Sequence, residues 1–417
     1  MSQPAPSPLS VFRNRSFSLM WTGRLVSTFG DSLTQLAAGI LVYRLTGSVL
    51  SVGLMLAVTA LPSLVFGLVA GVYVDRWDRK KILVVSSALQ AVFVALIPPL
   101  LPYGVVWLYI LVAFSSTVRQ FFEPAHDSVL PDVADEAALG AANSFMAVSA
   151  TASSILGFAA AGFLAARIDL PLIFLLDALT FVVTGLLLLG LRVPPHEPEE
   201  AVVRTVLGDM RAGLGLLFGS PLLRALFVLG VGFSFTIGVH NTLGLPFVLT
   251  ELRGGTEFIF GVQESVMAAG FVVGSSLMAA FAGKLRERQW LVLCFLVMGV
   301  AGLVYALIDS VALALALSTL VGVFNSPAVI AIKTLFQRHT PARLRGRVFG
   351  AYYVGLDAVF VLGILIGGLG DLLGIRLLFA VAALLTLGLG FMAAALPGLR
   401  AARADEGVNP GVVGLEP

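Results

Sequence analysis

Long apolar stretches recur along the whole chain, separated by short polar breaks, and this pattern limits the folds that are possible. A helix crosses the hydrocarbon core of a bilayer with about 20 apolar residues. Twelve stretches meet this requirement, near residues 17–43, 49–74, 82–101, 104–123, 141–166, 172–191, 223–249, 258–282, 290–308, 311–333, 347–369 and 376–396. The sequence therefore predicts an all-α membrane protein with twelve transmembrane helices.

The composition excludes several classes of protein. Only 12% of the residues are charged and 58% are hydrophobic, whereas soluble domains carry about 25% charge. A water-soluble enzyme is therefore excluded. The single cysteine, Cys294, allows no intrachain disulfide, and the four histidines lack the spacing of metal ligands. The first stretch contains Arg24 and Asp31, is too long for a cleaved signal peptide and is expected to stay in the mature protein.

The basic residues predict the orientation. Of the 26 lysines and arginines, 20 lie in the breaks on one side of the predicted membrane, together with both termini. The other side has only Arg44, Arg167, Arg253 and Arg376. Because cytoplasmic loops are enriched in lysine and arginine, both termini are predicted to be cytoplasmic. We expect a multi-pass protein in a bacterial cytoplasmic (inner) membrane, with the lipid bilayer as a partner and no binding of nucleic acid.

The longest break divides the chain into halves. We predict a six-helix bundle over residues 1–192, a cytoplasmic linker over 193–221, a second six-helix bundle over 222–397 and a disordered cytoplasmic tail over 398–417. A short amphipathic helix is expected around Val202–Phe218. Three short strings recur between the halves at nearly one offset, which indicates a duplicated unit. Such parallel repeats occur in secondary transporters with a substrate site near the midplane. One chain would then hold both halves of a cavity, so a monomer is expected.

One loop carries a family motif. The string Gly71-Val-Tyr-Val-Asp75-Arg76-Trp-Asp78-Arg79-Lys80-Lys81 resembles the hallmark Gly-x-x-x-Asp-Arg-x-Gly-Arg-Arg/Lys loop of the major facilitator superfamily. It departs from the pattern at Asp78, where the family has glycine. The resemblance implies a cytoplasmic latch between the halves that favours the outward-facing state, with Asp75 and Arg76 as its main polar parts. Gly71 would allow close helix approach, and the basic run would stay in water. A plain positively charged turn is the alternative.

Further strings narrow the resemblance. Gly30-Asp31-Ser-Leu-Thr34, Phe122-Glu-Pro-Ala125 and Leu344-Arg-Gly-Arg-Val-Phe349 resemble the branch of enterobactin exporters, macrolide-efflux proteins and mycobacterial multidrug pumps. This implies export of hydrophobic or amphiphilic small molecules, drugs or siderophore-like metabolites, by proton antiport with alternating access. The Gly-Pro-x-x-Gly-Gly signature of drug antiporters is replaced by Gly157-Phe-Ala-Ala-Ala-Gly162, which weakens the case for drug/proton exchange.

No phosphate-binding Gly-x-x-x-x-Gly-Lys-Ser/Thr string is present, so ATP does not drive this chain directly and no cofactor is expected. Proton or substrate gradients remain as the energy source. Two alternatives of the same fold stay open, namely a lysophospholipid flippase and a metabolite uniporter or importer. A membrane sensor that no longer transports is a more remote reading.

Ionisable side chains inside membrane spans are costly and are functional candidates by default. The sequence has seven that we place in a proton-coupling site or substrate cavity: Asp31, Arg24, Arg119, Glu123, Asp357, Asp177 and Glu264. We hypothesise that proton uptake breaks an Asp31–Arg119 or a Glu123–Arg119 pair. A permanent ion pair that braces two helices is the alternative.

The sequence around the remaining candidates indicates their roles less specifically. Asp357 could face the cavity from the second half. Glu264, near the outer end of the eighth span, could simply reach interfacial water. Asp177 fits a role in helix packing or folding as well as transport. His240, a lone histidine in the seventh span, is expected to pack against its neighbours.

Overall fold

The computed structural model describes residues 8–74, 76–134, 138–193, 213–281, 284–341 and 344–395, and within these ranges the chain is helical with no β-strand. The first half comprises η1 (Pro8–Arg13), α1 (Arg15–Thr46), α2 (Val49–Val74), α3 (Arg79–Ala95), α4 (Ile97–Leu100), η2 (Leu101–Tyr103), α5 (Val106–Val133), α6 (Leu139–Ala165) and α7 (Leu170–Leu189). The second half comprises α9 (Pro221–Glu251), α10 (Glu257–Ala280), α11 (Glu287–Leu307), α12 (Val311–His339), α13 (Arg345–Gly367), α14 (Gly370–Leu373) and α15 (Ile375–Ala395).

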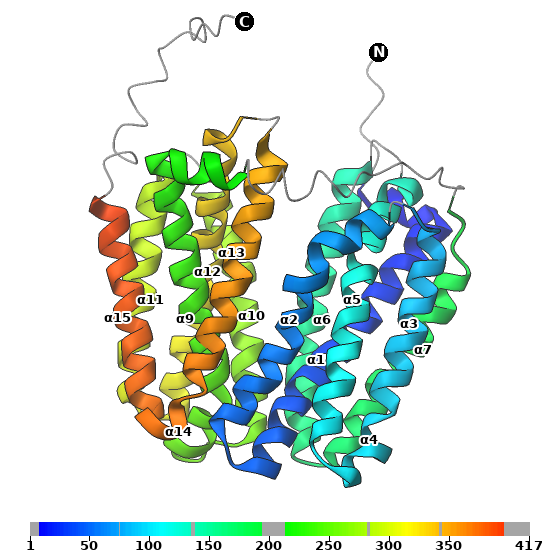
Figure 1. The fold of residues 1–417 in the computed structure, drawn as a ribbon, viewed down its shortest axis with the longest axis horizontal. Coiled ribbons are helices and arrows are strands. Elements are labelled where there is room, and N and C mark those ends of the chain that lie inside the picture. Colours follow the sequence, from blue (N-terminus) through cyan, green and yellow to red (C-terminus); the bar gives the residue numbers. More distant parts are fainter. Residues whose placement is uncertain are drawn as a thin grey trace, which may run out of the picture.

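The two halves stand side by side as helical bundles (Figure 1). The beginning of α1 and the end of α15 lie at the same end of the molecule, which we call the termini end; the other is the far end. Of the predicted linker and tail, residues 194–212 and 396–417 lie outside the described residues. Residues 213–219 are helical, and they include the described part of the expected helix Val202–Phe218, which is residues 213–218.

Among the described residues, eleven helices are long and apolar enough to cross a membrane. The long helix outside that set is α5, whose 28 residues include Arg119, Gln120 and Glu123. It continues to Val133, well beyond its predicted end, because apolar side chains at helical spacing keep one face buried: Phe122, Ala125, Val129, Leu130 and Val133. The third predicted span is interrupted after Ala95, where Pro98 and Pro99 begin a new turn as α4.

Small residues bring the halves together toward the far end. Gly162 of α6 faces Gly261 of α10, and a Cβ atom on Gly261 would lie 2.8 Å from the Gly162 Cα atom. Close approach of the two backbones therefore requires glycine at this crossing. The Ser265 hydroxyl donates to the Ile155 carbonyl across the same contact, at 2.8 Å. Elsewhere α2 packs on α13, with Ala57 buried against residues of that helix.

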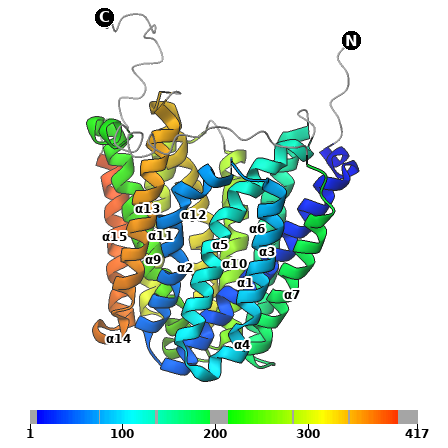
Figure 2. The same cartoon turned by 45° about the vertical axis from the view of Figure 1, so that its right-hand side comes forward.

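Polar groups close the far end, and we call the following contacts the far-end seal. The Asp371 carboxylate accepts from the Ser48 hydroxyl at 2.8 Å and from the backbone N–H groups of Val49 and Leu50 at 3.1 and 3.3 Å. It therefore caps the N-terminus of α2 from the other half. Arg44 of α1 also binds Glu257 of α10 at 2.9 Å. Toward the termini end the ribbons of the two halves diverge (Figures 1 and 2).

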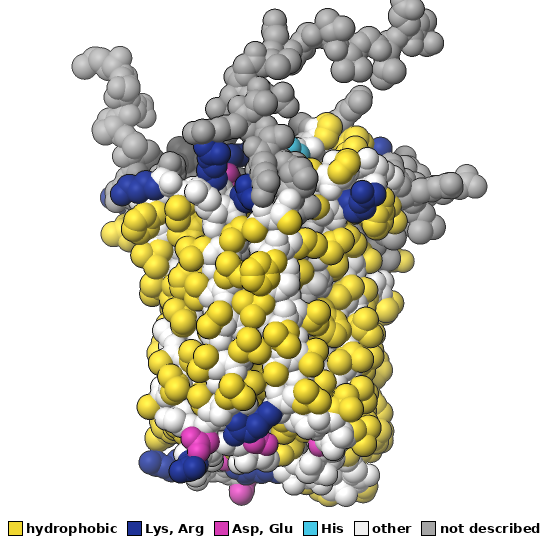
Figure 3. All heavy atoms as spheres, turned by 90° about the vertical axis from the view of Figure 1, so that its left-hand side faces the viewer, with side chains coloured by type: hydrophobic (Ala, Val, Ile, Leu, Met, Phe, Trp, Pro, Cys, Tyr) yellow, Lys and Arg dark blue, Asp and Glu magenta, His cyan; other side chains and the backbone are white. Residues whose placement is uncertain are grey.

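The surface has the pattern of a membrane-embedded body. A broad band of hydrophobic side chains covers the face of the second half that Figure 3 shows, with charged side chains at both ends. At the far end three arginines are paired with acids: Arg44 with Glu257, Arg253 with Asp309 and Arg376 with Glu251. Arg167 lies over the Phe163 ring, 4.5 Å from its centroid. The far-end arginines are thus largely neutralised, and the excess of basic residues in the sequence belongs to the termini end.

Candidate functional site

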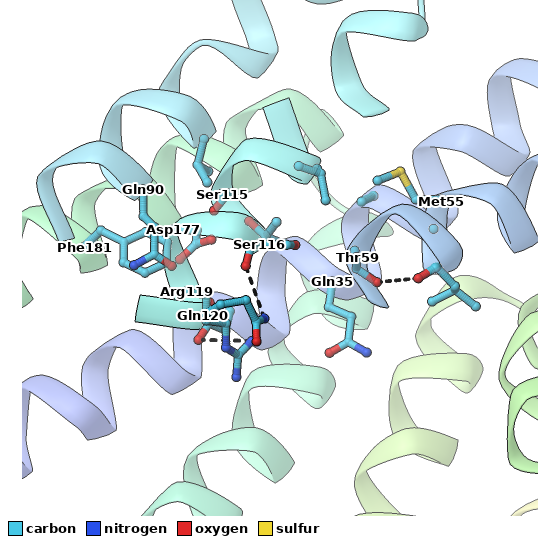
Figure 4. Close-up of a pocket in the computed structure, with 17 residues that line it drawn as sticks. Gln35, Met55, Thr59, Gln90, Ser115, Ser116, Arg119, Gln120, Asp177 and Phe181 are labelled. Carbon is cyan, nitrogen blue, oxygen red and sulfur yellow. Dashed lines mark hydrogen bonds and ion pairs between the residues drawn. The ribbon is translucent and has the colours of Figure 1, made fainter. Parts of the chain in front are cut away.

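A cavity of about 270 Å³ lies among the helices of the first half. We call it the first-half cavity. Its walls come from α1, α2, α3, α5 and α7, and its polar lining consists of Asp31, Thr34, Gln35, Thr59, Gln90, Ser115, Ser116, Arg119, Gln120 and Asp177. In Figure 4 Arg119, Gln120, Asp177 and Gln90 gather on one side of it, and Gln35, Thr59 and Met55 on the other. Polar side chains from five helices therefore converge on one space.

Four charged side chains form a continuous network between α1 and α5. Arg119 Nη1 lies 3.8 Å from Asp31 Oδ2, and Arg119 Nε donates to Glu123 Oε1 at 3.2 Å. Arg24 Nη1 donates to the same Glu123 oxygen at 2.9 Å. The local sequence explains the geometry, because Arg24 and Asp31 lie two turns apart on α1, whereas Arg119 and Glu123 lie one turn apart on α5. We call these residues the charge network.

Asp177 of α7 packs directly behind the network. Its side chain is buried, and Oδ1 accepts from the Thr180 hydroxyl at 3.0 Å. Oδ2 has no hydrogen-bond partner among the described residues. A Cβ atom on Gly30 would lie 2.1 Å from Asp177 Oδ1, so only glycine before Asp31 allows this approach. Asp177 and the network together contain three carboxyl groups and two guanidinium groups, which leaves one negative charge in excess when all are ionised.

The other two acidic candidates lie apart from the network. Asp357 of α13 accepts from the Ser63 hydroxyl of α2 at 3.0 Å, across the two halves. Glu264 of α10 faces the interior of the second half, where it lines a cavity of about 360 Å³. The alternative that Glu264 simply reaches interfacial water stays a prediction. The far-end position on α10 is held instead by Glu257, which binds Arg44, and Glu264 lies two turns deeper.

The hallmark loop is partly described. Asp75 lies outside the described residues, as do the surroundings of the Gly71 side-chain position, although Gly71 itself belongs to α2. Arg76 lies in the turn that follows and is exposed. Asp78, the departure from the family pattern, caps α3 by accepting from the Lys81 N–H at 3.1 Å. This capping explains why an aspartate fits there.

The expectation that the whole basic run stays in water was wrong for two members. Arg79 binds Asp132 at 3.4 Å and the Ser128 carbonyl at 3.3 Å, and 16% of its side chain is exposed. Lys80 donates to the Leu191 carbonyl at 2.8 Å, just past the end of α7. Both contacts remain within the first half and hold the start of α3 against α5 and α7. A cation near a helix C-terminus is favourable there.

Sequence reasoning missed several polar lining residues. Thr34 and Gln35 follow Asp31 at three and four residues, so one face of α1 is polar inside the membrane, and that spacing was a usable signal. His240 packs against its neighbours as expected, with its ring edge-on to Phe379 at 5.3 Å between centroids, and it also lines the cavity of the second half together with Glu264. Its Nε2 atom is buried and has no hydrogen-bond partner among the described residues.

Comparison with known proteins gives consistent matches over the chain. Residues 6–410 match the family model described as transmembrane secretion effector. The multidrug efflux pump Tap of Mycolicibacterium fortuitum is 28% identical over 387 residues, covering 90% of this chain and 94% of that protein. Macrolide efflux protein A of Streptococcus pyogenes is 26% identical over 283 residues, covering 66% and 69%. The crystal structure of the nucleoside transporter NupG has a similar fold, with a TM-score of 0.74 at 13% identity, covering 91% of this chain and 98% of that one.

Proposed function

Because this chain belongs to the transmembrane secretion effector family of the major facilitator superfamily, we propose that it exports hydrophobic or amphiphilic small molecules in exchange for protons. The relatives named for multidrug and macrolide efflux support export of drug-like compounds. Siderophore-like metabolites belong to the same chemical class. The transporter would act as a monomer in a bacterial cytoplasmic membrane.

The observation that carries the proton-coupling proposal is the charge balance in the first-half cavity. Among the described residues, the carboxyl groups of Asp31, Glu123 and Asp177 face the two guanidinium groups of Arg24 and Arg119, and His126, which is charged only when protonated, also lies near Glu123. An excess charge within the membrane-spanning part of a protein is costly, and one proton removes it. The Asp31–Arg119 pair is the longest contact of the network, at 3.8 Å between the two atoms. Proton binding at Asp31 would release Arg119 to Glu123 alone, and proton loss would restore the pair.

The orientation in the membrane is a further part of the proposal and rests on the distribution of basic residues. We propose that α5 is the twelfth spanning helix, in addition to the eleven that satisfy length and hydropathy, and that the termini end is cytoplasmic. The small number of basic residues at the far end, which are Arg44, Arg167, Arg253 and Arg376, supports this placement. With the far-end seal formed, this conformation would receive substrate from the cytoplasm or the inner leaflet. The hallmark loop would act as the latch in the opposite, outward-facing state.

Transport in vesicles tests the proposal. Proteoliposomes with an acidic lumen should accumulate tetraphenylphosphonium, a permanent cation that acid does not trap, or the macrolide erythromycin. A one-to-one exchange of cation and proton should concentrate tetraphenylphosphonium about tenfold per pH unit. A protonophore should abolish the accumulation, and protein-free vesicles should show none for tetraphenylphosphonium. Erythromycin is a weak base that an acidic lumen traps by itself, so only its accumulation above that of protein-free vesicles counts. Accumulation of neither compound by folded protein, or accumulation insensitive to the protonophore, would contradict proton-coupled export. Movement of lysophospholipid instead would indicate a lipid transporter.

A further inference from the structure

The second half contains a cavity that the charge network does not reach. It has a volume of about 360 Å³ and is enclosed by α9, α10, α11, α12 and α15; we call it the second-half cavity. Its apolar wall consists of the aromatic rings of Phe233, Phe271, Tyr305 and Phe379 and the thioethers of Met267 and Met298. The size falls within the usual range of small-molecule sites, about 300–1,000 Å³.

The aromatic wall is held in a fixed arrangement. The Tyr305 hydroxyl donates to Gln263 Oε1 at 2.9 Å, which satisfies its polar group outside the cavity. The Tyr305 ring stacks on Phe247 with centroids 4.6 Å apart, and Phe379 packs edge-on against Phe247 at 5.0 Å. The wall therefore keeps its shape without a ligand, as a pre-formed binding site does.

Polar groups on the cavity wall lack partners, in contrast to Tyr305. Ser318 is 3% exposed, and its hydroxyl makes no hydrogen bond within the described part of the chain. The buried Nε2 atom of His240 makes none either. The Glu264 carboxyl group lines the same cavity and has no hydrogen-bond or ion-pair partner among the residues that the structure describes. Buried polar groups are normally satisfied, so two buried groups without partners beside the unpaired carboxyl group of the half-buried Glu264 indicate a ligand that completes them.

The chemistry of the wall selects the ligand. The desolvation of a lone carboxylate in an aromatic cavity is not compensated by the protein, and either a proton or a positive charge on a ligand relieves this cost. The rings attract the same charge through their faces, and the methionines adapt to varied apolar shapes. We propose that the second-half cavity binds the cationic group of amphiphilic substrates, with Glu264 facing the positive charge. This proposal rests on the proposed export function and specifies the substrate class.

A smaller space lies between this site and the first-half cavity. Asn241 and Glu264 also line this space, which measures about 60 Å³ and lies between the halves. Gln35, Gly39 and Leu56 line both this space and the first-half cavity. Glu264 thus lies on the side of the second-half cavity that faces the first half. A cation bound at Glu264 and a proton bound in the network would occupy separate sites.

Direct binding tests the proposal without requiring transport. Full-length protein in lipid nanodiscs is titrated with tetraphenylphosphonium and with triphenylphosphine oxide, a neutral compound with similar rings. Glu264→Gln should weaken tetraphenylphosphonium binding by about 10- to 100-fold and leave binding of the neutral compound unchanged. Asp309→Asn removes an acid bound to Arg253 at the far end and should change neither. Phe379→Leu should weaken binding of both compounds, because it removes one aromatic ring from the cavity wall.

Three outcomes would overturn the assignment: unchanged tetraphenylphosphonium binding in Glu264→Gln, an equal loss for both compounds in that variant, or a selective loss in Asp31→Asn alone, which would place the cation in the first-half cavity. If Glu264-dependent binding is intact but vesicles show no proton-driven accumulation, the proposed proton coupling is overturned and the proposed cation site is retained.

Discussion

Replacing Arg119 with glutamine is expected to reduce gradient-driven transport by about 10- to 100-fold while the protein remains folded. Arg119 contacts Asp31 and Glu123 through different nitrogen atoms. Without it the three carboxyl groups of the site face only Arg24, and protons would stay bound in every conformation. Because 46% of the Arg119 side chain is exposed in the cavity, the loss of stability should be small, within about 1 kcal/mol. Uptake into acidic vesicles and thermal unfolding measure the two effects separately.

Arg119→Lys is the matched control for the charge. A lysine ammonium is a single point charge and cannot hold two carboxylates through separate donors as a guanidinium does. We therefore expect a transport rate for Arg119→Lys that lies between the rates of the native protein and of Arg119→Gln. Native-level transport by folded Arg119→Gln would show that the arginine only braces α1 against α5.

Replacing Asp371 with alanine is expected to open the far end. The variant loses the cap on α2 and the charge beside that helix N-terminus, which together are worth about 1–2 kcal/mol at a partly exposed site. The population of outward-open molecules should rise by a factor of about 5–30. Spin labels at Tyr103 and Leu307, exposed residues at the far end of the two halves, report this opening by a longer distance in a Cys294→Ser background.

Asp309→Ala controls for loss of a far-end acid, because Asp309 binds Arg253 within the second half. Its distance distribution should match that of the native protein. An unchanged distribution in Asp371→Ala would mean that the packing of α6 on α10 and of α2 on α13 keeps the far end closed without the polar seal.

The helices could be predicted from the sequence because their positions depend on local patterns. Apolar stretches and positively charged breaks are properties of the chain itself. The end of α5 was misjudged because its termini-end segment, through Val133, is amphipathic rather than uniformly apolar. Arg119 and Glu123, one turn apart on that helix, could be assigned to each other from their spacing.

Contacts between distant segments could not be predicted in this way. Ser48 and Asp371 are 323 residues apart, and each resembles an ordinary polar loop residue. The bond between Arg24 and Glu123 and the position of Asp177 depend on how α1, α5 and α7 pack. Gly30 carried a local hint, since a glycine beside an intramembrane aspartate permits close approach of another helix, but its partner could come only from the fold.

The most direct test of the account compares uphill transport with counterflow in Asp31→Asn. The substitution keeps the size of the side chain and leaves two carboxyl groups facing two guanidinium groups, so the site no longer needs a proton. Uphill accumulation in acidic vesicles should be lost, while exchange of labelled for unlabelled tetraphenylphosphonium at equal pH should persist. Uphill accumulation at the native level in this variant would contradict the assignment of proton coupling to the charge network.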